Sequence, residues 1–440
     1  MYKKSVKLSP YQLLILIFFV FIMIGTCLLK LPLSTTEYIS WIDALFTATS
    51  AATVTGLIVV DTPAVFTTFG EVVILSLIQL GGLGIMSFAV LIYMMLGKKI
   101  SLKDRIIVQQ ALNQTSIGGI IKLVKYLFIF SLTIELIGMM LLAFKWVPEY
   151  GWGTGLYYSL FHSVSAFNNA GFALWSDSLM GYVGDPLVNT VITTLFIIGG
   201  IGFTVLIDVW QTKKLKKFSL HSKLMIIGTV VLNVVAMLLV FVLEFHNPNT
   251  LASLSTLSDK LWAAYFQGVV TRTAGFNTID IAAIDESTAF LMVILMFIGA
   301  GSASTGGGIK LTTFLVIVFG VLSFLKGKKD VVISNRSISN EIVFRALAIS
   351  SISLFFVLLA VFILTISEDA PFLVSLFEVV SAFGTVGMSM GLTYSLTLVG
   401  KIIIIFIMFL GNIGPLTLVY SLSKPRVSKI KYPKEDLLTG

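Results

Sequence analysis

The chain has 440 residues, of which 57% are hydrophobic and only 12% are charged, against roughly 25% charged residues in an average soluble domain. A surface that faces water needs more charge than this chain supplies, whereas a surface that faces lipid must do without it. The composition therefore excludes an ordinary soluble enzyme and predicts an all-α polytopic membrane protein. The single cysteine, Cys27, excludes an intrachain disulfide.

The orientation in the membrane is predicted from the lysines and arginines. Five short segments carry 24 of the 30, namely 1–10, 97–125, 211–223, 326–345 and 424–440. By the positive-inside bias, these segments and both termini are expected on the cytoplasmic side of the cell membrane. The chain must leave and return between them, which predicts four hairpins and eight crossings. Acidic residues predominate elsewhere, either as ordinary solvated loops or as a negative vestibule that concentrates cations.

The four hairpins share one pattern. Each has a long apolar run, a short semi-apolar segment that ends in glycine, and a second apolar run. In all four, an aromatic residue precedes that glycine by ten positions, and the glycines are 115, 104 and 112 residues apart. This repetition predicts four homologous repeats around one pore. We place them at 1–97, 98–211, 212–326 and 327–423, followed by a cytoplasmic tail at 424–440.

The short semi-apolar segments are 41–57, 157–172, 262–276 and 373–388. They are too short to cross the hydrocarbon core, which suggests re-entrant segments. A dozen helical residues reach about halfway across a core of about 30 Å. The chain must then return as non-helical backbone, which is tolerated at that depth only where it lines water or is buried in protein. We therefore expect four short pore helices, each followed by an extended strand.

The four strands are small-residue segments that end in glycine, and we call them the glycine segments. Their carbonyl oxygens can replace the hydration shell of a monovalent cation because no bulky side chain intervenes. Any one glycine could merely permit tight packing, but four at matched positions favour a cation filter. The candidate ion-binding residues are Thr53, Val54, Thr55 and Gly56; Asn168, Asn169, Ala170 and Gly171; Thr273, Ala274 and Gly275; and Thr385, Val386 and Gly387.

Four such motifs in one chain resemble the Trk/Ktr/HKT superfamily of potassium transporters. The first reads Thr-Val-Thr-Gly-Leu and the last Gly-Thr-Val-Gly-Met, with Asn-Asn-Ala-Gly-Phe and Arg-Thr-Ala-Gly-Phe between them. The match covers essentially the entire chain and, within the superfamily, is similar to the membrane subunits of bacterial Ktr systems.

The resemblance implies a fold and a set of partners. Each repeat would supply one wall of a single pore, and two chains would form a homodimer. Potassium, preferred over sodium, would be the transported ion, with sodium stimulating uptake. A cytosolic ring of nucleotide-binding subunits, which bind ATP or ADP, would regulate the gate. This chain itself is expected to bind no cofactor and no nucleic acid.

The third repeat has an unusually long second apolar run, 290–325, which contains five glycines between positions 299 and 308. Each glycine costs a helix about 1 kcal/mol relative to alanine, so the helix is expected to break. A phosphate-binding loop is excluded because no Gly-Lys-Ser/Thr occurs. The resemblance implies an intramembrane gating loop at 299–310, with candidate gate residues Gly301, Ser302, Ser304, Thr305, Gly306, Gly307, Gly308 and Lys310. The Lys310 charge is expected to oppose cation passage.

The other second runs contain short glycine motifs at 80–84, 198–202 and 410–415. For the first two we predict close helix packing. Family members often carry an arginine in the last motif, where this chain has Asn412. We include Asn412 among the gate residues and expect a weaker barrier there.

Several ionisable residues fall within or beside apolar runs, and such residues are functional candidates by default. They are Glu135, Asp208, Glu378 and Arg272. For Glu378 we slightly favour bonding to backbone amides over ion binding. Arg272 is interpreted as a partner for such a carboxylate rather than as a pore-lining cation.

The function expected from these features is potassium uptake through a channel-like pore. The alternative is a secondary carrier that couples sodium or protons to a solute. A membrane enzyme is disfavoured because the sequence contains no paired His, Asp and Glu constellation.

Overall fold

The computed structural model of the protein describes residues 9–84, 120–212, 214–328 and 330–422, with single positions at 87, 106, 109 and 435. Most of the basic segments 1–10, 97–125 and 424–440 lies outside the described residues, as does nearly all of the predicted tail. Within the described ranges the chain is almost entirely helical, as predicted.

Four long helices match the first apolar run of each hairpin. They are α1 (Pro10–Leu29), α7 (Ile120–Tyr150), α11 (Leu220–Glu244) and α15 (Asn340–Ser367). By length and composition, each of these helices can cross a membrane. Many of their outward side chains are large and apolar, for example Val242 at 68% and Phe355 at 60% exposed. Such a surface is stable against lipid rather than water.

Four short helices occupy the predicted re-entrant positions. They are α2 (Trp41–Ala52), α8 (Trp152–Phe167), α12 (Leu257–Val270) and α16 (Phe372–Gly384). Hydroxyl caps fix two of their starts, since Ser40 accepts from the backbone N–H of Asp43 and Thr256 from that of Asp259. The backbone leaves the helix at the glycine segment in each case. Because they have only 12 to 16 residues, none can span the hydrocarbon core alone.

The second helix of each hairpin is interrupted or short. Its pieces are α4 (Thr68–Gly82); α9 (Pro186–Ile201) and α10 (Phe203–Thr212), bent by 94°; α13 (Glu286–Phe297) and α14 (Leu311–Leu325); and α18 (Leu398–Ile413) and α19 (Pro415–Leu422), bent by 95°. The predicted break of the 290–325 run is thus confirmed. Counting each bent pair as one span gives up to six candidate spans among the described residues. The other two predicted crossings are α4, at the edge of the described residues, and the interrupted pair α13 and α14.

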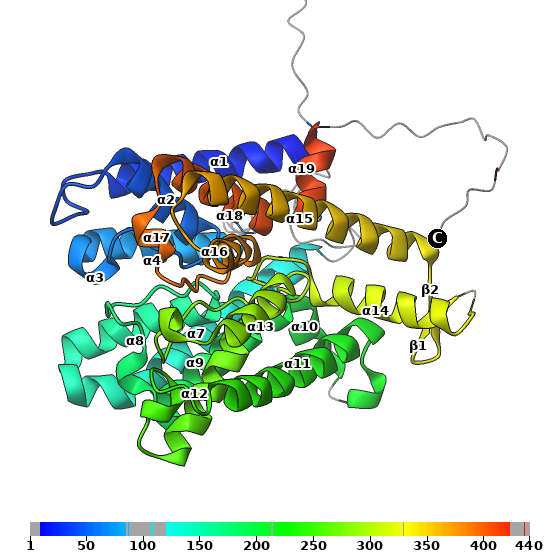
Figure 1. Ribbon diagram of the computed structural model, residues 1–440, viewed down its shortest axis with the longest axis horizontal. Helices are drawn as coiled ribbons and strands as arrows, with labels where there is room; N and C mark the ends of the chain where they lie inside the picture. Colours follow the sequence, from blue (N-terminus) through cyan, green and yellow to red (C-terminus); the bar gives the residue numbers. More distant parts are fainter. Residues whose placement is uncertain are drawn as a thin grey trace, which may run out of the picture.

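Short elements lie at the two ends of the bundle (Figure 1). The helices α3 (Thr62–Val65) and α17 (Leu392–Ser395) lie at one end. A hairpin of β1 (Val331–Ile333) and β2 (Arg336–Ile338) lies at the other, with Val332 opposite Ser337 in antiparallel register. Single-turn 3-10 helices complete the described elements at Met180–Tyr182, Leu215–Lys217, Leu251–Ser253 and Ile281–Ala283.

The short helices join neighbouring hairpins into a ring. The helix α8 packs against α4 of the preceding hairpin, α12 against α9, α16 against α13, and α2 against α18. Side-chain contacts reinforce these pairs: Tyr157 donates to Glu71 at 2.7 Å, Tyr265 to Thr193 at 3.1 Å, and Lys401 pairs with Asp43 at 2.7 Å. At the fourth junction the rings of Phe297 and Phe383 stack. The last hairpin therefore closes onto the first.

The glycine motifs of the second helices have two roles. A Cβ at Gly81, Gly199 or Gly411 would lie 1.8 to 2.0 Å from the carbonyl oxygen of Ala52, Phe167 or Phe383 respectively, at or next to the end of a short helix. The predicted close packing is therefore observed. In the motifs of the second and fourth hairpins the last glycine bends the helix instead. Gly202, between α9 and α10, and Gly414, between α18 and α19, have φ values of 103° and 88°. This bend was not predicted.

We expect Gly199→Ala to destabilise the protein, because its Cβ would lie 1.8 Å from the Phe167 carbonyl oxygen and overpacking costs about 1–3 kcal/mol. Thermal unfolding in detergent measures the effect. Gly153→Ala is the matched control, since no heavy atom of the described residues lies within 4 Å of its added Cβ. Equal melting temperatures for the two variants would contradict the packing role.

Candidate functional site

The four glycine segments form one closed ring. A Cβ at Gly56 would lie 2.4 Å from the carbonyl oxygen of Ala170, and one at Gly171 would lie 2.9 Å from that of Ala274. A Cβ at Gly275 would lie 2.5 Å from the Val386 oxygen, and one at Gly387 would lie 2.1 Å from the Thr55 oxygen. Each glycine therefore contacts the next segment in chain order, and the fourth contacts the first. The ring brings the candidate ion-binding residues together around one axis.

The backbone of the glycine segments is unusual in a repeated way. In all four, the glycine has positive φ, and so does the residue two positions before it: Val54, Asn169, Thr273 and Thr385. A regular strand points successive carbonyl groups to opposite sides, and a change of φ sign at every second residue can turn them to the same side. The four carbonyls that precede the glycines belong to equivalent residues, namely 55, 170, 274 and 386.

Hydrogen bonds to the end of each short helix hold this backbone. The N–H groups of Thr55, Ala170 and Val386 each donate to the carbonyl five residues back at 2.8 Å, while Ala274 donates four residues back to Val270. Three serines six positions before the glycine add to these bonds. Ser50 and Ser381 accept from the glycine N–H, and Ser165 donates to the Phe172 carbonyl. Sequence reasoning missed these serines, although their common spacing could have revealed them.

All four segment glycines line a single cavity of about 260 Å³. It lies toward the α3 and α17 end, since Thr62 and Tyr394 also line it. Asp61, Asp177 and Asp280 are on its wall. The Ser176 hydroxyl, in the second hairpin, donates to Asp61 in the first. The geometry thus favours the vestibule interpretation of these acidic residues, because a low-dielectric concavity with one sign of charge attracts cations.

The loop 299–310 lies directly against the glycine segments. Asn169 donates to the Thr305 hydroxyl at 3.0 Å, and the Gly307 N–H donates to the Thr385 hydroxyl at 2.8 Å. A Cβ at Gly306 would meet the Thr273 hydroxyl oxygen at 2.5 Å. The loop therefore contacts the positive-φ residue of three of the four segments.

The same loop is anchored to the bend between α9 and α10. The Gly301 N–H donates to the Gly200 carbonyl at 2.8 Å, and the Phe203 N–H donates to the Ala303 carbonyl at 2.8 Å. Within the loop, Ser304 donates to Gly301 and Ser302 lies 3.4 Å from the Thr312 hydroxyl. The loop is thus an ordered element with partners on both sides.

Lys310 and Asn412 have specific bonds that the sequence did not predict. The Lys310 Nζ donates to the carbonyl of Gly306 at 2.6 Å and so closes the loop on itself. Asn412, on α18, donates to the carbonyl of Thr53 at 3.1 Å. Its bonding partner is therefore the first glycine segment, the one whose positive-φ residue has no described contact with the loop.

Glu135 lies behind the second glycine segment. It is 4% exposed and accepts from Gln79 at 3.0 Å, from Ser131 at 2.7 Å and from the Asn168 amide at 3.2 Å. The Asn168 amide also donates to Gln79 at 2.8 Å. The Asn168 side chain is thus held inside the protein, while its backbone belongs to the ring. Gln79 was missed, although it is a polar residue within an apolar run.

The other ionisable candidates have structural partners. Glu378 accepts from the hydroxyls of Ser389 and Thr393 and so holds the turn after the fourth segment. The sequence predicted backbone amides as its donors, and the structure adds these two hydroxyl groups. Asp208 accepts from Ser219 and Ser222 at the β-hairpin end. Arg272 has no carboxylate within 4 Å among the described residues, so its predicted ion pair is wrong.

Comparisons with known proteins show the family and the fold of this chain. Residues 8–429 match the TrkH family, described as a cation transport protein. The chain is 60% identical over 437 residues to the Ktr system potassium uptake protein B of Bacillus subtilis, covering 99% of this chain and 98% of that protein. It is 38% identical over 454 residues to the potassium/sodium uptake protein NtpJ of Enterococcus hirae, covering 100% and 99%. The fold is similar to the crystal structure of the potassium transporter TrkH from Vibrio parahaemolyticus, with a TM-score of 0.75, 22% identity and coverage of 96% and 87%.

We expect Glu135→Leu to destabilise the chain, because it removes the acceptor of Ser131, Gln79 and Asn168. The Gln79 amide would keep only a long 3.4 Å bond to Ser131 among the described residues. An unsatisfied buried group costs about 1–3 kcal/mol. Glu135→Gln retains one acceptor oxygen and should lose less. Leu136→Ala, at a lipid-facing neighbour that is 51% exposed, is the control for thermal unfolding. A Glu135→Leu protein as stable as this control would refute the network.

Proposed function

Because the chain belongs to the TrkH family of cation transport proteins, we propose that it conducts potassium ions into the cell through a channel-like pore, with the glycine segments as its filter. It is a multi-pass membrane transport protein and not an enzyme. The observation that carries the proposal is the closed ring of four segments, each presenting an equivalent carbonyl beside the glycine of the preceding segment. Carbonyl rings of this kind replace the hydration shell of potassium.

The acidic vestibule and the membrane potential supply the direction of flux. A cation concentrated near Asp61, Asp177 and Asp280 enters the ring from that side. Moving one positive charge inward across a membrane potential of 100 mV releases about 2.3 kcal/mol. Cation uptake therefore needs no chemical step to drive it. The names of two relatives, a potassium uptake protein and a potassium/sodium uptake protein, support potassium as the substrate and sodium as a second transported ion. That sodium also stimulates uptake is part of the proposal.

The loop 299–310 is the proposed gate. It is bonded to Asn169 and Thr385 of the ring, so an ion that leaves the filter on that side meets it. Opening would break these bonds and the Lys310 contact with Gly306. The proposed partners are a second copy of this chain and a cytosolic ATP- or ADP-binding ring. The names of relatives as proteins of a Ktr system support an assembly of several components.

The proposed filter is tested by Gly56→Ser in liposomes with rubidium, potassium and sodium gradients. The serine would have its Cβ 2.4 Å from the Ala170 carbonyl oxygen at a φ of 91°. We expect the preference for potassium over sodium to fall about tenfold, equivalent to about 1.4 kcal/mol.

Gly391→Ser is the matched control for that experiment. Gly391 lines the same cavity and has a φ of 95°, but no heavy atom lies within 4 Å of its added Cβ. Its selectivity should stay that of the unaltered chain. Solute-dependent uptake without potassium flux would overturn the proposed function and favour a secondary carrier. Adding external sodium to the same liposomes tests the stimulation.

We expect Lys310→Met to raise potassium flux in the same liposomes, because the loop loses the bond that closes it on Gly306. A hydrogen bond contributes about 0.5–1.5 kcal/mol, which predicts a flux about two- to tenfold higher. Lys326→Met removes an exposed charge at the end of α14 and should change nothing. An unchanged or lower flux for Lys310→Met would contradict the gate assignment.

A further inference from the structure

Arg272 occupies the position three residues before the glycine in the third segment. The equivalent residues are Thr53, Asn168 and Gly384. The two long side chains, Asn168 and Arg272, both extend away from the ring toward the long helix of their own hairpin. Asn168 reaches Glu135 on α7, and Arg272 reaches Asn233 on α11.

The two positions differ in charge balance. The neutral amide of Asn168 meets a carboxylate, whereas among the described residues the hydrogen-bond partner of the cationic Arg272 guanidinium is the neutral amide of Asn233, at 3.5 Å. The Arg272 Nε is buried and has no hydrogen-bond partner among the residues that the structure describes. No carboxylate lies within 4 Å of Arg272 in the part of the chain that the structure describes.

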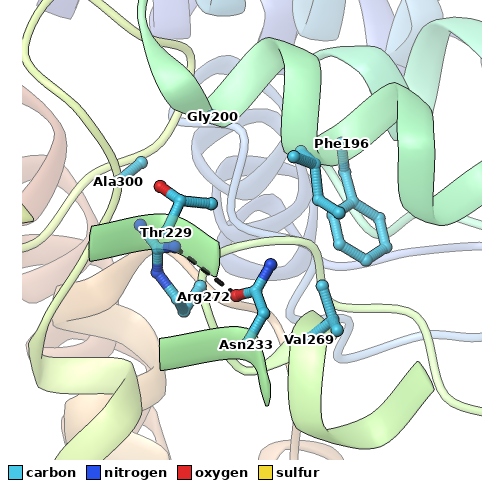
Figure 2. A pocket seen from close by; sticks show the side chains of 8 residues that line it. Phe196, Gly200, Thr229, Asn233, Val269, Arg272 and Ala300 are labelled. Atoms are coloured by element: carbon cyan, nitrogen blue, oxygen red, sulfur yellow. Dashed lines mark hydrogen bonds between the residues drawn. The ribbon is translucent and has the colours of Figure 1, made fainter. Parts of the chain in front are cut away.

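A small cavity lies beside this guanidinium (Figure 2). Its volume is about 20 Å³, and its wall comes from α9, α11, α12 and the loop at Ala300. The hydroxyl of Thr229 lines it and is likewise buried, with no partner in the described part of the chain. About 10–15 Å³ suffices for one water molecule, so the cavity has room for one small ligand. Phe196 and Val269 provide apolar contacts, as Figure 2 shows.

The charge decides which ligand fits. An isolated buried cation is costly in a low-dielectric region, and a counter-ion removes much of that cost. A water molecule would satisfy the hydrogen bond of Nε without neutralising the guanidinium. We propose that this cavity binds a small monovalent anion, such as chloride, as the counter-ion of Arg272, with the Thr229 hydroxyl as a second donor.

This site has a consequence for the ring. Arg272 is the first residue of the third glycine segment, so its charge opposes a cation bound in the ring. An anion behind the segment cancels that field while leaving the backbone carbonyls unchanged. The binding site itself does not rest on the proposed function, because it follows from the cavity and the unpaired guanidinium alone.

Bromide tests the site directly. Crystals of the full chain in which bromide replaces chloride should give an anomalous difference peak between Arg272, Asn233 and Thr229. Arg272→Gln should abolish the peak. Thr229→Val, which keeps the arginine and the shape of the cavity, should weaken bromide binding and guards against a misfolded Arg272 variant.

A solution measurement complements the diffraction. Thermal unfolding of the purified chain is compared in chloride and in gluconate at equal ionic strength, and chloride should give the higher melting temperature. Arg272→Gln should lose this difference. Lys401→Gln should keep it, because Lys401 already has Asp43 as its counter-ion.

Three results would overturn the proposal. They are a cavity that holds a water molecule without anomalous signal, a bromide peak that persists in Arg272→Gln, and equal melting temperatures in chloride and gluconate. Each can occur while potassium flux is normal, and the expected results can occur while flux is absent. The anion site and the proposed function therefore fail independently.

Discussion

The close approach of backbone to backbone in the glycine ring is the constraint on which the rest of the structure depends. Each segment brings a glycine against the carbonyl group of the next segment. A Cβ added at any of these glycines would lie only 2.1 to 2.9 Å from that carbonyl oxygen. Because the fourth segment contacts the first, no hairpin can shift alone. The short helices and the second helices are packed so as to keep the four segments at this separation.

The ring contains backbone that is costly to hold, and the surrounding bonds offset that cost. Val54, Asn169, Thr273 and Thr385 all have positive φ, where a residue with a Cβ is strained by about 1–3 kcal/mol. Bonds to the ends of the short helices hold three segments in the same way. The third segment is braced differently, and it is also the one whose own hairpin supplies the loop 299–310. The asymmetry among the repeats is therefore concentrated around the third hairpin.

Charged groups inside the bundle have polar partners, but two cations, Arg272 and Lys310, have no carboxylate within 4 Å among the described residues. Lys401 is paired with Asp43, Glu135 accepts from amides and a hydroxyl, and Lys310 donates to a loop carbonyl. Such partners are required where water is scarce, because an unpaired polar group is costly there. Arg272 lacks an anionic partner among the described residues and lies beside a cavity. Its charge is a feature of the third hairpin, since the other segments have Thr53, Asn168 and Gly384 at that position.

The sequence by itself determined the long helices, the short helices before each glycine and the break of the 290–325 run, because apolar length, glycine spacing and helix propensity are local properties. Only the tertiary structure decided the order of the ring, the bends after Gly202 and Gly414, and the partners of Asn412, Lys310 and Arg272. Asn412 meets a carbonyl 359 positions away, and Asn169 meets Thr305 across 136. A local pattern reports whether a residue faces lipid, water or protein, but the identity of its neighbour depends on how all four hairpins close around one axis.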